Sequence, residues 1–144
     1  MNERNEVLNN HYNNYDEDSR LIKNNSHMLE YITTTNYIYK YLKPNMKILE
    51  VGAGTGRYSL KYAKEGYEVY SIEYVNHNLE ILKSKIEPNM NIKAELGDAI
   101  DLSRYEDNTF DITLVLGPLY HLYEKLKSIF LFSCSLSRHR DPIV

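Results

Sequence analysis

The sequence predicts an α/β fold in which a parallel sheet of about four strands carries helices on both faces. Three observations support this class. Short apolar runs alternate with helical patterns along residues 46–116. A turn with three glycines joins the first apolar run to the first helical pattern. The run at 111–116 is almost continuously apolar, as expected of a strand that is covered on both faces.

The glycine turn lies at Gly52, Gly54 and Gly56, directly after the first apolar run. Glycine adopts positive φ at little steric cost and allows a ligand to approach the backbone. The first amides of the following helix then face that ligand at the positive end of the helix dipole. The second apolar run ends in Glu73, whose two oxygens suit the paired hydroxyls of a ribose. These residues therefore predict a nucleoside site.

The spacing of the glycines narrows the class of nucleoside. A dinucleotide fingerprint would place its third glycine at position 57, which is Arg57, and no phosphate-loop Gly-Lys-Ser/Thr follows. Glu50 precedes the first glycine by two residues and would repel a pyrophosphate at short range. A ligand with an amino group or a sulfonium fits this acid better.

Four segments in this order resemble the class I S-adenosylmethionine-dependent methyltransferases. Residues 50–56 (Glu-Val-Gly-Ala-Gly-Thr-Gly) resemble the first motif of that family, and Glu73 resembles its ribose-binding acid. Residues 97–99 (Gly-Asp-Ala) resemble the stretch that holds the adenine, and residues 110–122 resemble the fourth strand and the loop that faces the methyl donor. Upstream, residues 12–42 resemble the N-terminal lid region of one bacterial branch. The likeness covers roughly residues 12–123.

The resemblance implies a Rossmann-like sheet preceded by an N-terminal helical lid, with S-adenosyl-L-methionine as cofactor. His121 is then the candidate general base, with a loop histidine bonded to backbone as the alternative, and Tyr120 could face the sulfonium through a cation–π contact. Asp98 would accept from the adenine amine, or alternatively cap a turn. The implied cofactor-binding residues are Glu50, Gly52, Ala53, Gly54, Gly56, Glu73, Tyr74, Asp98, Ala99, Leu116 and Tyr120.

The chain divides into an N-terminal arm or lid (1–25), a cofactor-binding domain (26–133) and an atypical tail (134–144). Capping and breaking residues set the limits of the elements in the domain, with Ser26 and Pro44 bounding the first helix and Gly66 ending the second. The strands are expected at 47–51, 68–74, 91–96 and 111–116, and the helices at 26–42, 57–65, from 76 or 78 to near 86, and from 119 to about 133.

The C-terminal residues depart from the family pattern. The family usually continues to seven strands, so we expect a truncated or frame-shifted chain whose tail is non-homologous from about Leu126. The strand order implied by the resemblance, three-two-one-four, leaves the fourth strand at an edge. Since an open apolar edge pairs with other chains, we expect a homodimer through the fourth strand.

Composition fits one soluble domain. The chain has 144 residues and a net charge of −3, which gives no reason to expect nucleic acid as a partner. Its one cysteine excludes an internal disulfide and fits a reducing compartment. With no signal-peptide pattern and no bilayer-length apolar run, we expect a cytoplasmic protein without a membrane partner. The five histidines lack ligand spacing, so no metal site is expected.

Three functions remain open at this stage. The first is a methyltransferase, or its cofactor-binding portion, that acts on an unidentified small-molecule acceptor. The second is a non-catalytic module that binds the cofactor or a nucleotide, or a truncated remnant that dimerises through its sheet edge. The third is a nicotinamide-dependent oxidoreductase, which Arg57 in place of the third glycine disfavours.

Overall fold

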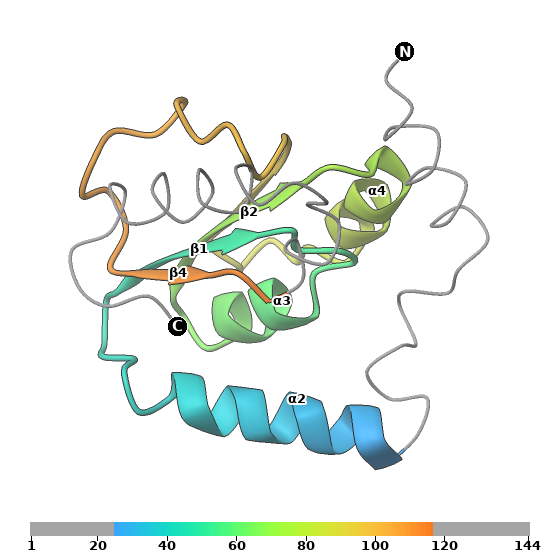
Figure 1. Cartoon of the computed structure of the whole chain (residues 1–144), viewed down its shortest axis with the longest axis vertical. Coiled ribbons are helices and arrows are strands. Elements are labelled where there is room, and N and C mark those ends of the chain that lie inside the picture. The colour runs from blue at the N-terminus through green and yellow to red at the C-terminus, as the bar shows by residue number, and fades with distance from the viewer. Residues whose placement is uncertain (1–24, 117–144) are drawn as a thin grey trace.

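A four-stranded parallel sheet forms the centre of the molecule. The computed structural model describes residues 25–116 (Figure 1). Its strands lie in the order β3-β2-β1-β4, which confirms the predicted order and the α/β class. Their bounds are β1 Lys47–Val51, β2 Glu68–Glu73, β3 Ile92–Leu96 and β4 Ile112–Leu114. Because all pairings are parallel, the carboxyl ends of the strands lie at one edge of the sheet.

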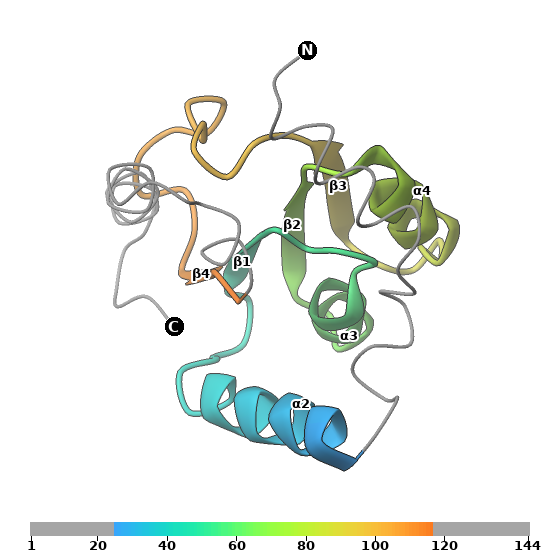
Figure 2. The same cartoon turned by 45° about the vertical axis from the view of Figure 1, so that its right-hand side comes forward.

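Three helices pack against one face of the sheet (Figure 2). They are α2 Asn25–Ile38, α3 Arg57–Lys64 and α4 Asn76–Ser84. In α3, Tyr58 and Tyr62 point inward at a spacing of four residues and pack on Ile48 of β1. Ile38 of α2 joins the same cluster. The described helices are therefore one layer, and none of them is long and apolar enough to cross a membrane.

The opposite face of the sheet is covered by the connection between β3 and β4, residues 97–111, which contains no helix in the described structure. Tyr70 of β2 meets Tyr105 and Phe110 of this connection in edge-on ring contacts, with centroids 5.9 and 5.2 Å away. Leu49 and Ile72 are buried beneath them. Among the residues that the structure describes, this face is therefore covered by an irregular aromatic layer, and the predicted helix from 119 to about 133 lies outside them.

Two predicted elements differ in length from those observed. The first helix ends at Ile38 rather than Leu42, because the chain tightens into turns ahead of Pro44, with the Tyr41 N–H donating to the Ile38 carbonyl at 3.0 Å. Few of its apolar residues reach the core, since Leu29 is 65% exposed while Thr35 and Ile38 are buried. The predicted fourth strand shortens to Ile112–Leu114, where its pairing with β1 ends.

Several predictions concern residues outside the described range. They are the arm or lid at 1–24, Tyr120, His121, the helix after 119, the domain boundary near 133, and the tail at 134–144.

Candidate functional site

The turn after β1 brings the first predicted site residues together. Gly52, Gly54 and Gly56 have φ of 76°, 57° and 84°, so the turn needs the left-handed region at each of them. The amides of Gly52 and Ala53 donate to the Ile72 carbonyl of β2 at 2.8 and 3.0 Å. The turn is thereby fixed at the carboxyl ends of β1 and β2.

Helix α4 packs tightly beneath the turn. A Cβ added at Gly56 would lie 2.5 Å from Leu82 Cγ, too close for any side chain. Leu82 is fully buried, so it cannot move into solvent. Gly56 therefore serves close packing as well as backbone shape, which is a reason for glycine that does not involve a ligand.

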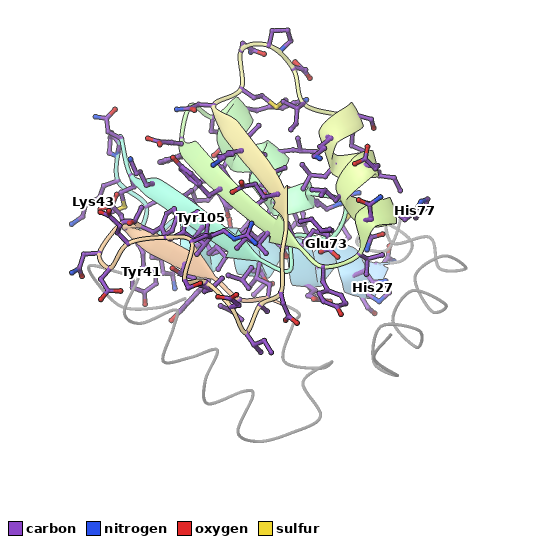
Figure 3. The ribbon with its side chains drawn as sticks, turned by 90° about the horizontal axis from the view of Figure 1, so that it is seen from above. His27, Tyr41, Lys43, Glu73, His77 and Tyr105 are labelled. Atoms are coloured by element: carbon purple, nitrogen blue, oxygen red, sulfur yellow. The ribbon has the colours of Figure 1, made fainter. Side chains whose placement is uncertain are left out.

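Glu73 ends β2 and lies against the same turn (Figure 3). Its Oε2 accepts from the Gly54 amide at 2.7 Å and its Oε1 accepts from the Val75 amide at 2.8 Å. Burial raises the pKa of this carboxyl, and these amides act against that rise. The Tyr74 amide and the Asn78 side chain also hydrogen-bond to this carboxyl, so it is held by donors from several parts of the chain.

Asn78, in the first turn of α4, is a residue that the sequence reasoning missed. Its side chain hydrogen-bonds to the Glu73 carboxyl and is only 2% exposed. One signal could have found it. Val75, Leu79 and Leu82 form the buried stripe of α4, and position 78 falls on that stripe at helical spacing. A polar residue on a buried stripe calls for a specific partner.

Glu50, on β1, lies behind the turn and caps the following helix. Its carboxylate accepts from the Ser59 amide at 2.9 Å and from the Ser59 hydroxyl. The Ser71 hydroxyl of β2 in turn donates to Ser59 Oγ at 2.7 Å. Ser59 is the third residue of α3, so Glu50 satisfies an amide that the helix itself leaves unpaired. Ser59 and Ser71 were not predicted as site residues.

Burial raises the pKa of Glu50 to about 7, against the two Ser59 hydrogen bonds that lower it. The charge of Glu73 raises it further. Two buried carboxyls thus flank one glycine turn, each held by backbone amides. A cation that binds at this turn would favour the ionised form of both.

The remaining predicted site residues in the described range are Asp98 and Ala99, which follow β3, and Tyr74 and Leu116, which follow β2 and β4. Asp98 Oδ1 accepts from the Ile100 amide at 3.2 Å, which is the turn-capping geometry weighed as its alternative role. Ala99 is buried in the cluster that contains Leu49 and Ile72. Tyr74, beside Glu73, is half-buried, and Leu116 is half-buried against the helical face.

Aromatic contacts connect α2 to the start of α3. The Tyr31 and Tyr58 rings lie 5.1 Å apart, and the Arg57 guanidinium lies 5.6 Å from the Tyr31 ring centre. Since Arg57 and Tyr58 directly follow the glycine turn, the first half of α2 forms a wall beside it. In Figure 3, His27 of α2 lies on the same side of the molecule as Glu73.

A cavity of about 320 Å³ opens on the other face of the sheet. None of the predicted cofactor residues between 25 and 116 lines it. Three of its ionic side chains have partners, since Lys93 pairs with Glu95 at 3.4 Å and Arg104 donates to the Leu96 carbonyl at 3.1 Å. The candidate site is therefore the glycine turn with its two carboxyls.

Comparison with known proteins is consistent with this site. A family model described as a methyltransferase domain matches residues 48–134. The demethylmenaquinone methyltransferase of Staphylococcus aureus is 35% identical over 80 residues, which are 53% of this chain and 33% of that protein. The chain thus spans about a third of this curated relative.

Two solved structures illustrate the shared fold. A SAM-dependent methyltransferase of Methanosarcina mazei has a TM-score of 0.66 at 22% identity, covering 72% of this chain and 52% of that one. The phosphoethanolamine N-methyltransferase 1 of Haemonchus contortus, solved with phosphoethanolamine and S-adenosylhomocysteine, has a TM-score of 0.77 at 19% identity, covering 97% and 31%.

Proposed function

This chain belongs to the methyltransferase domain family, and we propose that it binds S-adenosyl-L-methionine and transfers its methyl group to an acceptor. The observation that carries the proposal is the glycine turn at the carboxyl ends of β1 and β2, flanked by the buried carboxyls of Glu50 and Glu73. Ligands of open α/β sheets bind at this edge. Related proteins are named as users of the same methyl donor.

The residues present fit this ligand. Glu73 lies at the carboxyl end of β2, where its carboxylate would meet the ribose hydroxyls, and its geometry is fixed by the Gly54 and Val75 amides. Glu50 supplies negative charge behind the turn, where the ligand's ammonium and sulfonium would be stabilised. A nicotinamide dinucleotide would instead place a pyrophosphate beside these acids. Their electrostatics thus favour the cationic ligand.

The bound ligand supplies an electrophilic methyl group, which an acceptor nucleophile displaces in line from sulfur. The chain contributes alignment and exclusion of water, so proximity carries much of the rate. We assign ligand contacts to Gly52, Ala53, Gly54 and Gly56 through their backbone, and to Tyr74, Asp98, Ala99 and Leu116 at the nucleoside. Tyr120 beside the sulfonium and His121 as general base complete the proposal, both from the sequence resemblance.

The acceptor is proposed to be a small molecule. The wall formed by the first half of α2 would limit the size of what reaches the turn. Pairing of two chains along β4, which bonds to β1 on its described side, is a further proposal.

The test is acceptor-dependent formation of S-adenosylhomocysteine by the full chain. Acceptor pools grouped by nucleophile (amines, phenols, thiols and carboxylates) are incubated with methyl-labelled donor, and product is measured by mass spectrometry. Glu73→Ala should lower turnover at least about tenfold when the donor is not saturating. Glu68→Ala, at the other end of β2, is the matched control and should retain it. Donor binding with no turnover on any pool would contradict the transferase proposal and favour a non-catalytic binding module.

A further inference from the structure

Asn78 occupies a position in α4 where the fold alone would favour an apolar residue. It is 2% exposed and lies on the buried stripe with Val75, Leu79 and Leu82. Within residues 25–116, which the structure describes, its Oδ1 is buried and has no hydrogen-bond partner. A buried acceptor without a partner destabilises a fold. A leucine has the same number of side-chain heavy atoms and no polar group, so it would avoid that cost.

The amide nitrogen of Asn78 gives a reason for an asparagine at this position. An ionised carboxylate only accepts hydrogen bonds, so the Glu73 carboxylate must be met by Nδ2, and Oδ1 is left without a donor. The Asn78 donor adds to the backbone amides of Gly54, Tyr74 and Val75. Donors from three segments, namely the glycine turn, the chain after β2 and helix α4, therefore hold the Glu73 carboxylate.

We propose that Asn78 is a positioning residue that orients the Glu73 carboxylate for the ribose of the bound ligand, at a cost to the stability of the fold. The proposal rests on the function proposed above, since it needs Glu73 at the ligand. It assigns a role in binding to α4, whose contacts with the turn otherwise serve packing through Leu82. Asn78 itself acts through Glu73 and need not touch the ligand.

The first test separates binding from folding. Asn78→Leu removes the donor and the unpartnered oxygen together. We expect S-adenosylhomocysteine to bind about tenfold more weakly by calorimetry, since a hydrogen bond to a charged group is lost. The melting temperature should stay the same or rise. A fall in melting temperature with unchanged affinity would show a structural role and overturn the proposal.

The second test asks whether the effect passes through Glu73. In a Glu73→Ala background, Asn78→Leu should change the affinity by less than about twofold, because the group it orients is gone. Asn76→Leu, at the exposed start of the same helix, is the matched control and should bind like the wild type. Equal losses in both backgrounds would contradict positioning through Glu73.

A third variant gives a pH signature. Asn78→Asp preserves shape but places a second carboxylate beside Glu73, with Glu50 as the other acid that interacts with Glu73. Its affinity should be lowest at high pH and recover on acidification, when a shared proton restores a donor between the two carboxyls. The wild type should lack this recovery. If the wild type itself does not bind S-adenosylhomocysteine, the proposed function fails; if it binds and all variants match it, only the role of Asn78 fails.

Discussion

Glu50 shows how one buried acid can serve both the fold and a site. It is 3% exposed and satisfies the amide of Ser59 at the start of α3. Burial raises its pKa to about 7, so near neutrality the folded protein holds it partly protonated. An uncharged side chain could make the same hydrogen bonds at less cost. The ionisable group at this position therefore favours a role toward a cationic ligand.

The raised pKa of Glu50 makes stability depend on pH. The folded chain retains this proton between about pH 4.5 and 7 while the unfolded chain releases it, so the free energy of unfolding should fall as pH rises through that window. The loss is on the order of 3 kcal/mol at full ionisation. Urea denaturation at pH 5 and pH 8 measures it. Glu50→Gln should narrow the difference between the two pH values.

The contribution of Glu73 and a control variant at Glu80 help to interpret this experiment. The pKa of Glu73 is also raised, so part of the pH dependence should persist in Glu50→Gln. Glu80→Gln, on the exposed side of α4, should behave as the wild type does. An unchanged pH difference in Glu50→Gln would show that Glu50 is not the group responsible.

At the scale of elements, the glycine turn and α4 form one packed unit. Gly56 combines a φ of 84° with contact to Leu82, whereas Gly66, after α3, has a φ of 91° and open space around it. Both glycines therefore have a left-handed backbone, but only at Gly56 would a side chain also clash with a neighbour. Substitutions at these two glycines can therefore separate the cost of backbone strain from the cost of the steric clash.

Alanine substitution at these two glycines should give unequal losses. Gly66→Ala should lower the free energy of unfolding by about 1 kcal/mol, the cost of a left-handed alanine. Gly56→Ala should lower it by about 1–3 kcal/mol more, because Leu82 must also shift. Denaturant melts of both variants measure the difference. Equal losses would mean that α4 does not pack on the turn as described.

The elements that local patterns define were predicted well. Strand β1 was predicted at its observed limits, because the apolar run ends directly at the glycine turn and this turn marks the end of the strand. The left-handed Gly66 was predicted from its place after a helical pattern. The first helix was predicted to end four residues too late, because Tyr39 and Leu42 continue the apolar spacing into the turns ahead of Pro44, although Tyr39 is 40% exposed. Exposed apolar residues carry no signal of their own that distinguishes them from core.

At the scale of the whole molecule, the order of the strands followed from the family resemblance, and the structure confirms it. The positions of the candidate site residues at the carboxyl edge followed from parallel pairing. The pairings of Glu50 with Ser59 and of Glu73 with Asn78 did not, because they depend on how α3 and α4 fold back on the sheet. The spacing between such partners has no fixed value that a sequence pattern could reveal.

The central claim is that the turn flanked by Glu50 and Glu73 binds S-adenosyl-L-methionine. A calorimetric titration of the full chain with that compound, with NAD as control ligand, tests it most directly. The account predicts binding of the first ligand alone, weakened at least about tenfold by Glu73→Ala and unaffected by Glu68→Ala. Binding of NAD instead, or no binding by a chain that circular dichroism shows to be folded, would contradict it.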